Sequence, residues 1–246
     1  MTSIGTRLRW RGLAVESVPE DHLHRLNFSK HGVEIRKQLL AQRDIRFVAA
    51  DISLESDILR SGGIRNLEKK FASIARLAGD PMLLGIANDL LGGPSKLVRV
   101  LFFDKTPERN WAVAWHQDKT VTLNKKIDME GWGPWSVKEG VCHVQPPCAV
   151  LDRMLTVRLH VDPTDETNGC LRVIPGSHRS GILKQEEIDR WVKSHRVVSC
   201  AVSAGDAVVL KPHVLHSSRR TLSRAHRRVV HLDYSDYELP EGVCWA

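Results

Sequence analysis

The stretch Gly205-Asp-Ala-Val-Val-Leu-Lys-Pro-His-Val-Leu-His216-Ser-Ser218 carries the clearest indication of the fold. Val208, Leu210, Val214 and His216 share one parity along it, which is the period of a β-strand with one apolar face. Four other short segments are also rich in β-branched residues and bounded by turn residues: Leu97–Phe103, Val150–Val161, Arg196–Val202 and Arg228–Tyr234. Because no helical pattern intervenes, this part of the chain predicts an antiparallel sandwich or barrel.

The first hundred residues have a different period and predict helices. Apolar residues recur at three- and four-residue steps across Ile64–Leu77, the pattern of a helix with one buried stripe. Asp80-Pro81 is typical of a helix start, and Gly92 of the residue that ends one. His22-Leu-His24 has no accompanying carboxylate motif, so we assign this pair to a surface helix rather than to a metal site.

Length and composition fit a single folded domain. The 246 residues are 42% hydrophobic and 26% charged, which is ordinary for a globular protein and excludes wholesale disorder. No apolar run reaches the ~18 residues that span a bilayer, and no secretory signal is evident. We expect one domain over 1–246, with a mainly helical support region at 1–95, a β core at 96–236 and a tail at 237–246.

Charge and cysteine content restrict the class of partner. The formal net charge is +7, but the most basic stretch, residues 219–228, lacks the interleaved aromatic residues on which nucleic-acid bases stack. The five cysteines form no CxxC pair, which argues against a zinc finger and favours a reduced, cytoplasmic setting. We therefore expect a small-molecule substrate, with neither nucleic acid nor membrane as partner. The sequence leaves the oligomeric state open.

Two motifs about a hundred residues apart carry candidate metal ligands. In Trp115-His116-Gln-Asp118 the imidazole and the carboxylate are two residues apart, so an extended backbone places both on one face. His216 lies on the apolar face of its expected strand, where the alternative role is a hydrogen-bonded core histidine. Two imidazoles and one carboxylate on one face of an octahedral ion leave three positions open, which suits Fe(II) and O2. His213, of opposite parity, is the reserve ligand.

The ordered combination of motifs resembles the phytanoyl-CoA dioxygenase family of Fe(II)- and 2-oxoglutarate-dependent oxygenases. The similarity covers Leu97 to Tyr234, a little over half the chain. Its elements are, in order, His116-Gln-Asp118, Asn168-Gly-Cys-Leu-Arg-Val-Ile-Pro-Gly-Ser-His178, Gly205-Asp206, His216-x-Ser218 and Arg227. The resemblance implies a mainly β fold, with a double-stranded β-helix (jelly-roll) core flanked by α-helices. The N-terminal hundred residues carry none of these motifs.

The resemblance also implies a chemistry. His116, Asp118 and His216 would bind Fe(II), while Arg227 and Ser218 would bind the C5 carboxylate of 2-oxoglutarate. Consumption of O2 would then hydroxylate a C–H bond of the substrate and release succinate and CO2. The resemblance does not extend to the substrate; Arg158 and the basic charge balance suit a small polar, amino-acid-like or carboxylate-bearing metabolite. Because Asp118 is present, halogenation is disfavoured. Two alternatives stay open: desaturation or cyclisation at the same iron site, and a non-catalytic basic jelly-roll binding protein.

Two adjacent arginines, Arg227 and Arg228, are candidates for binding 2-oxoglutarate. Arg228 shares the apolar parity of Val230, which usually marks the inward face. The spacing from the distal histidine instead resembles the family pattern at Arg227, which shares its face with His231. We favour Arg227, because a cosubstrate pocket is itself polar and Arg228 can lay its stem over apolar neighbours while its charged end reaches water.

Further side chains are candidate contacts of the cosubstrate or substrate. An arginine within a strand, such as Arg158, costs free energy unless it is paired. It either meets a carboxylate of the cosubstrate or substrate or lies on the outer face. Lys105 and Thr120 are additional candidates for the cosubstrate. The Gly-, Pro- and Trp-rich segment 128–147 has little strand character and is expected to form a lid. Its candidate substrate contacts are Trp132, Trp135, Lys138 and His143.

Overall fold

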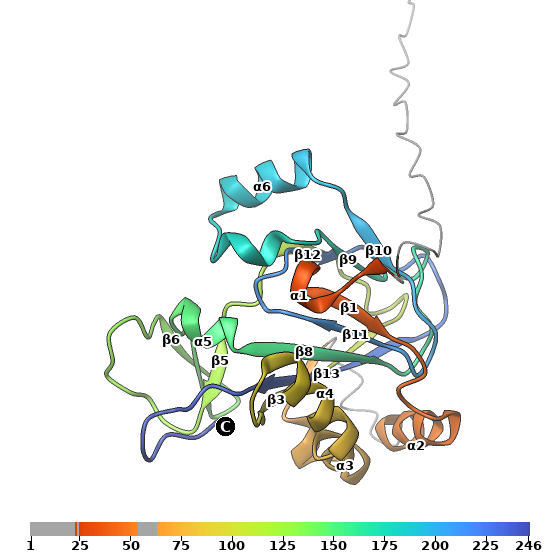
Figure 1. The fold of residues 1–246 in the computed structure, drawn as a ribbon. Helices are drawn as coiled ribbons and strands as arrows, with labels where there is room; N and C mark the ends of the chain where they lie inside the picture. The colour runs from red at the N-terminus through yellow and green to blue at the C-terminus, as the bar shows by residue number, and fades with distance from the viewer. Residues whose placement is uncertain (1–22, 24, 54–62) are drawn as a thin grey trace, which may run out of the picture.

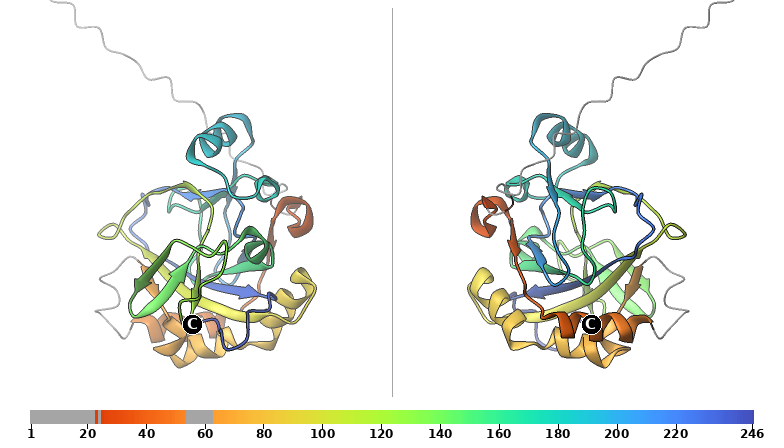
Figure 2. Two further views of the ribbon diagram at one scale, coloured as in Figure 1. Left: turned by 90° about the vertical axis from the view of Figure 1, so that its left-hand side faces the viewer. Right: turned by 90° about the vertical axis from the view of Figure 1, so that its right-hand side faces the viewer.

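The computed structural model describes residue 23 and residues 25–53 and 63–246 (Figure 1). The expectation for His22-Leu-His24 therefore lies outside the described residues. Two antiparallel sheets form the centre of the molecule, and a group of helices covers the outer face of the larger sheet (Figures 1 and 2). Within the described part of the chain, no helix is both long and apolar enough to cross a membrane.

The larger sheet has six strands, and its neighbours are all antiparallel. In spatial order they are β1 (Val33–Arg36), β11 (Ala207–Leu210), β8 (Met154–His160), β13 (Arg227–Ser235), β3 (Lys96–Lys105) and β2 (Gly63–Arg65). The smaller sheet has four: β10 (Val198–Cys200), β9 (Leu171–Val173), β12 (His216–Ser218) and β4 (Val113–His116). The two sheets share a core cluster in which Val173 of one packs with Val208 of the other. The predicted jelly-roll architecture is confirmed.

Both faces of the larger sheet are buried. The helices α2 (Gln42–Ser53), α3 (Ala72–Ala78) and α4 (Pro81–Leu91) lie against its outer face (Figure 2). Valine, leucine and phenylalanine side chains of the central strands meet these helices in the largest core cluster, which includes Val157, Leu232 and Phe102. The inner face looks toward the four-stranded sheet and carries the site described below.

The helical prediction for the N-terminal region is right for α4 and wrong for part of the preceding segment. Asp80 caps α4 by accepting a hydrogen bond from the backbone N–H of Met82 at 2.8 Å, and Gly92 ends it at φ +89°. The predicted helix over 64–77 begins only at Ala72, because Ile64 pairs with Phe102 at the edge of the sheet. The periodic apolar residues of this segment are nevertheless buried, as expected.

The predicted strand over 206–216 is wrong because it consists of two strands in different sheets. Strand β11 ends at Leu210, and a turn follows. The backbone N–H of Val214 closes this turn by donating to the Lys211 carbonyl at 3.1 Å. Pro212 lies in this turn, where the missing N–H removes a donor from any continuing ladder. His216 then begins β12 in the opposite sheet.

The segment 128–147 contains more regular structure than predicted. β6 (Trp135–Lys138) and β7 (Val141–Val144) form a hairpin, and β5 (Val121–Leu123) pairs with β7 to complete a three-stranded sheet. The expectation of little strand character is therefore wrong, because short strands with glycine and proline at their ends give a weak local pattern. The short helix α5 (Cys148–Asp152) follows, so the strand expected from Val150 begins instead at Met154. The remaining helices are α1 (Phe28–His31) and α6 (Gln185–Ser194), with 3-10 turns η3 (Leu67–Lys69) and η4 (Ser177–Ser180).

Candidate active site

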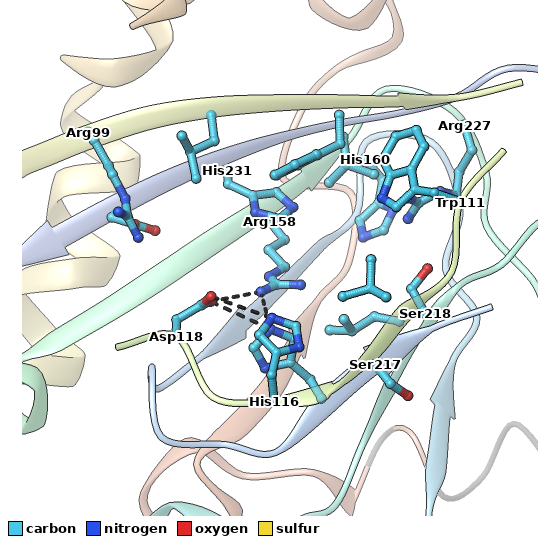
Figure 3. A pocket seen from close by; sticks show the side chains of 17 residues that line it. Arg99, Trp111, His116, Asp118, Arg158, His160, Ser217, Ser218, Arg227 and His231 are labelled. Atoms are coloured by element: carbon cyan, nitrogen blue, oxygen red, sulfur yellow. Dashed lines mark hydrogen bonds and ion pairs between the residues drawn. The ribbon is translucent and has the colours of Figure 1, made fainter. Parts of the chain in front are cut away.

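A cavity of about 280 Å³ lies between the two sheets (Figure 3). β3, β8 and β13 line one side of it, and β4, β9 and β12 line the other. Along β13 the lining residues are Arg227, Val229, His231 and Asp233, which is one parity of that strand. On β13 the cavity is therefore lined by the set of alternate residues that includes the polar ones.

One end of the cavity holds His116, Asp118 and His216. Antiparallel pairing of β4 with β12 puts His116 directly opposite His216, with ring centroids 4.2 Å apart. The carboxylate of Asp118 lies 3.7 Å from Nε2 of His116 and 3.5 Å from Nε2 of His216. The backbone N–H of Asp118 donates to the carbonyl of Pro212 at 3.0 Å, which fixes this residue against the turn before β12. Three ligand atoms of the predicted kind thus converge on one point.

Hydrogen bonds to the backbone select the tautomer of both imidazoles. Nδ1 of His116 lies 2.8 Å from the carbonyl of Ala114, and Nδ1 of His216 lies 2.8 Å from the carbonyl of Val214. Since a carbonyl oxygen only accepts, each Nδ1 carries the proton and each neutral ring keeps the lone pair on Nε2. Burial, followed by the charge of Arg158, lowers the pKa of His216 to about 3 and keeps that ring neutral. The Nε2 atoms that face Asp118 are therefore the ones able to bind a metal.

Arg158 of β8 reaches across the cavity to these ligands (Figure 3). Its guanidinium donates to the carboxylate of Asp118 at 3.1 Å and lies 2.9 Å from Nε2 of His216. Burial by itself raises the pKa of Asp118, but His216 and Arg158 outweigh that effect and hold it below its usual range. Arg158 thus lines the cavity and does not lie on the outer face, whereas its contact with a carboxylate of the cosubstrate or substrate stays a prediction.

Arg227 and Ser218 line the other end of the cavity, and Lys105 adjoins them. Only 8% of Arg227 is exposed, and its Nε has no hydrogen-bond partner among the residues that the structure describes. Lys105 is fully buried and donates to the hydroxyl of Ser218 and to the carbonyl of Arg219. Burial, followed by the charge of Arg227, lowers the pKa of Lys105 to about 7. This end is cationic, and Trp111 closes it with its ring 5.4 Å from Nζ of Lys105.

Comparisons with known proteins agree with this arrangement. The family model for phytanoyl-CoA dioxygenase (PhyH) matches residues 42–229, which is most of the chain. The chain belongs to this family. The match begins in α2, so the family resemblance includes much of the helical layer that the motifs alone left out. The family comprises non-haem iron, 2-oxoglutarate-dependent dioxygenases, and this chain spans less than two thirds of the length of the curated relatives that it matches.

Three relatives illustrate the similarity. L-proline trans-4-hydroxylase of Streptomyces griseoviridis is 27% identical over 187 residues, which cover 65% of this chain and 62% of that protein. The crystal structure of AviO1 from Streptomyces viridochromogenes Tue57 has a TM-score of 0.64 at 22% identity and covers 87% of this chain and 93% of the other. EctD from S. alaskensis, crystallised with 2-oxoglutarate and 5-hydroxyectoine, has a TM-score of 0.66 at 18% identity over 89% and 76% of the two chains. The structural likenesses support the fold.

Within this PhyH domain, the two neighbouring arginines face opposite sides of β13. Arg227 lines the cavity, whereas Arg228 forms a two-point ion pair with Asp162, in which both nitrogen–oxygen distances are 2.8 Å. The apolar residues that share the parity of Arg228, such as Val230 and Leu232, pack on the helices. The apolar parity is therefore the outer, helix-covered face, which is why periodicity favoured the wrong neighbour for a place in the cavity.

Several lining residues of the PhyH cavity escaped the sequence analysis. His160 and His231 lie between the two ends of the cavity, and neither ring nitrogen of His160 has a partner among the described residues. Burial, followed by the charge of Arg227, lowers the pKa of His160 to about 3, so its ring is neutral. His160 is two residues beyond Arg158, so strand parity carried the signal that would have found it.

Arg99 and Asp233 form a second buried feature of the cavity wall that was not predicted. Nε of Arg99 donates to the carboxylate of Asp233 at 2.6 Å, and the hydroxyl of Thr156 donates to the same carboxylate at 2.6 Å. Thr120, a predicted cosubstrate contact, is exposed and lies 3.4 Å from Arg99 without lining the cavity. Its contact with the cosubstrate stays a prediction that its position does not favour.

The predicted lid residues lie in or near the three-stranded sheet. Trp132 is buried in a separate core cluster, and Trp135 packs against that cluster while donating from Nε1 to the carbonyl of Trp132 at 3.2 Å. Lys138 is exposed and His143 is buried, with its pKa lowered to about 4 by burial and by Arg99. None of these four described residues lines the cavity, so their contact with substrate stays a prediction without geometric support here.

Proposed function

We propose that the protein hydroxylates a C–H bond of a small, carboxylate-bearing polar metabolite of the amino-acid kind. In this proposal His116, Asp118 and His216 bind Fe(II), and Arg227, Ser218 and Lys105 bind the C5 carboxylate of 2-oxoglutarate. When bound, iron and 2-oxoglutarate supply the chemistry: O2 is reduced, one oxygen atom enters the substrate, and 2-oxoglutarate is oxidised to succinate and CO2. The chain itself binds, orients and shields the reactants.

The three ligands fit Fe(II) by their chemistry and by their tautomers. Two neutral imidazoles and one carboxylate are the donor set of the facial triad of non-haem iron enzymes. The backbone carbonyls of Ala114 and Val214 accept from both Nδ1–H groups, so the lone pairs are on the two Nε2 atoms, which lie 3.7 and 3.5 Å from the carboxylate of Asp118. Such hydrogen bonds behind a ligand orient its ring and raise its basicity.

Arg227 carries the assignment of 2-oxoglutarate. A buried guanidinium with an unsatisfied nitrogen is costly, and burial, followed by the charge of Arg158, lowers the pKa of Arg227 to about 10. Lys105 adds a second buried cation beside it. A carboxylate placed between these groups would remove the cost by pairing with both, because guanidinium and carboxylate match in a two-point geometry. The iron ligands line the same cavity, as expected for one cosubstrate that reaches both ends.

The charge of the cavity favours an anionic substrate. Its charged lining residues are Arg99, Arg158, Arg227, Asp118 and Asp233, and Lys105 adjoins them. Fe(II) adds two positive charges and 2-oxoglutarate two negative ones, so a surplus of positive charge remains. The carboxylate of a substrate would offset it, with Arg158 as the nearest cation to the iron ligands. The relative named L-proline trans-4-hydroxylase supports a substrate of the amino-acid class.

The uncharged part of the cavity excludes water. Leu101, Phe103 and Val113 line it together with the neutral imidazoles of His160 and His231. The ring of His231 lies 4.7 Å from that of Phe103, so the apolar and imidazole surfaces are continuous. A wall of this kind lowers the local dielectric and strengthens the ion pairs at both ends.

An anaerobic titration tests the proposal directly. The full-length protein is mixed with Fe(II) and then with 2-oxoglutarate, and a weak visible absorption band is expected only when both are present. Succinate formation is then measured against a panel of amino acids and other carboxylates. Folded protein that binds neither Fe(II) nor 2-oxoglutarate would overturn the proposal and favour the non-catalytic alternative. Arg158→Met should weaken turnover of the carboxylate substrate while the band with 2-oxoglutarate persists.

The product separates hydroxylation from the other outcomes of the same site. A hydroxylated product gains one oxygen atom, whereas desaturation or ring closure removes two hydrogen atoms and adds none. Mass spectrometry of the product formed by the best substrate distinguishes the two. Asp118 disfavours halogenation because its carboxylate takes the ligand position that a halide would need.

A further inference from the structure

A second group of metal-ligating side chains lies outside the cavity. Cys148 and Asp152 stand at the two ends of α5, and His213 lies in the turn between β11 and β12. This is the histidine that the sequence offered as a reserve iron ligand, and the structure places it in a different cluster from His116 and His216. We propose that Cys148, Asp152 and His213 bind a divalent transition metal, Zn²⁺ in preference, at a site separate from the iron site.

The distances within this cluster match those around a tetrahedral ion. The Sγ of Cys148 lies 3.9 Å from either ring nitrogen of His213 and 3.8 Å from the carboxylate of Asp152. The carboxylate and Nδ1 of His213 are 3.2 Å apart. Zinc–sulfur bonds of ~2.3 Å and zinc–nitrogen or zinc–oxygen bonds of ~2.0–2.1 Å, at tetrahedral angles, separate ligand atoms by roughly 3.3–3.6 Å. Small side-chain rotations would bring the three atoms to those separations.

Hydrogen bonding alone explains the cluster poorly. Each thiol contact is at the long end for sulfur, and Sγ is equally far from two nitrogens instead of directed at one of them. Only the Asp152–His213 contact has the length of an ordinary ion pair. One ring offers a single nitrogen to an ion, and Nδ1 of His213, 3.2 Å from the carboxylate of Asp152 and 3.9 Å from Sγ of Cys148, is the nitrogen placed to share an ion with both.

The donor set selects the class of metal. A thiolate, an imidazole and a carboxylate are ligands of Zn²⁺ and similar borderline ions, whereas Mg²⁺ and Ca²⁺ prefer oxygen alone. His213 is 2% exposed and Asp152 is 58% exposed, so the site has a buried anchor and an open side. The open side gives the ion an entry path and leaves a fourth position for water.

A metal here would restrict the turn that positions the iron ligands. The turn that carries His213 also accepts the backbone N–H of Asp118 through the carbonyl of Pro212 at 3.0 Å. The carbonyl of His213 itself accepts from Nε2 of Gln117 at 2.9 Å. Fixing His213 to α5 would therefore restrict the same turn that positions Asp118 and leads into His216.

Cobalt binding to the intact chain tests the site. Co²⁺ bound by a thiolate gives a strong near-ultraviolet charge-transfer absorption, and the iron site has no thiol among its described lining residues. We expect this absorption to appear as up to about two equivalents of Co²⁺ are added, since the iron site also takes Co²⁺, to be displaced by Zn²⁺, and to be lost in Cys148→Ser. The matched controls are Cys142→Ser and Cys244→Ser, which remove a half-buried and an exposed thiol and should leave the absorption unchanged.

A second variant keeps the test decisive if Cys148→Ser fails to fold. Asp152→Asn changes an exposed side chain and should weaken Co²⁺ binding at the thiolate site at least tenfold, by analogy with the 10–100-fold losses seen at supporting ligands. Absence of the thiolate absorption in folded wild-type protein would overturn the proposal, as would its persistence in Cys148→Ser. The absorption is measured without 2-oxoglutarate, so its result tests the second metal site independently of the proposed function.

Discussion

The two faces of the six-stranded sheet are both buried, yet they differ in composition. On β3, β8 and β13, one parity of residues packs on the helices and is apolar, as Phe102, Val157 and Leu232 show. The other parity lines the cavity and includes Arg158 and Arg227. In a strand buried on both sides, apolar alternation therefore identifies the supporting face, and the polar residues between them identify the site.

The two faces also contribute to stability with opposite signs. Each buried apolar side chain on the outer face stabilises the fold by about 1.5–3 kcal/mol through removal from water. The buried cations of the inner face, Arg158, Arg227 and Lys105, lose hydration and are only partly paired. Functional sites commonly depart from local rules in this way, and the surrounding structure offsets the cost.

The largest effect is expected on the inner face, at the iron ligands. Asp118→Ala and His216→Ala should each lower succinate formation at least ~10²-fold. Even mutation of a group that is only hydrogen-bonded to a metal ligand lowers metal affinity or activity about 10–100-fold. Neither side chain belongs to the apolar cluster beneath the helices, so both variants should fold and have the far-ultraviolet circular dichroism of wild type. Iron content and succinate formation are the measurements. Full turnover in His216→Ala would remove this residue from the ligand set.

On the outer face, truncation should affect stability and leave binding intact. Phe102 is 1% exposed and packs in the helix-covered cluster, so Phe102→Ala should lower the free energy of unfolding by about 3–5 kcal/mol. Urea unfolding measures this change. The 2-oxoglutarate KM of the remaining folded protein should equal that of wild type. A large rise in that KM would show that the two faces are not separable.

Local patterns in the sequence were sufficient for elements whose ends carry their own signals. The Asp80 cap and Gly92 defined α4, and the β-branched run over 97–103 defined the centre of β3. The His116-Gln-Asp118 spacing brought two ligands together, although only His116 lies in a strand: β4 ends there, and Asp118 is held two residues further by its backbone bond to Pro212. These predictions needed no knowledge of distant contacts.

The features that were missed depend on partners distant in sequence. Ile64 matches a helical stripe, but its pairing with Phe102 places it in a sheet. The break after Leu210 reassigns His216 to another sheet, although the parity across the turn looks continuous. The sequence showed only that His231 shares a face with Arg227. That this face lines the cavity depends on which face of the sheet the helices cover. Tertiary contacts decided each of these outcomes.

A smaller effect, on binding alone, is expected at the far end of the inner face. Arg227→Ala should raise the 2-oxoglutarate KM by at least ~30-fold, since loss of a buried charge-assisted pair costs about 2–5 kcal/mol. Steady-state kinetics with 2-oxoglutarate as the varied substrate measures it. Arg227→Lys should recover only part of the loss, because an ammonium cannot form the two-point pair. An unchanged KM in Arg227→Ala would contradict the assignment.

The pKa of Lys105 predicts a modest pH dependence. Burial and Arg227 lower this pKa to about 7, so Lys105 is charged below that pH and neutral above it in the free enzyme. The charged form attracts the carboxylate, so kcat/KM for 2-oxoglutarate should fall several-fold as pH rises from about 6 to 8. Lys105→Met should have a lower kcat/KM without this slope. A wild-type profile that rises over the same range would contradict the sign.

The smallest effect is expected at Arg228, which differs from Arg227 by one position and lies on the other face. Arg228 already pairs with Asp162, and their side chains are 18% and 16% exposed. Arg228→Ala should therefore cost about 1 kcal/mol or less of folding stability, as partly exposed ion pairs do. Its 2-oxoglutarate KM should stay within about twofold of wild type, because a change of ~0.5 kcal/mol or less is usual away from a site. Asp162→Ala should leave the 2-oxoglutarate KM equally unchanged but cost more folding stability, because Asp162 also accepts from the backbone N–H of Arg228 at 2.9 Å. If Arg228→Ala raised the KM more than Arg227→Ala, the apolar parity would mark the binding face and the contrast between the two faces would be reversed.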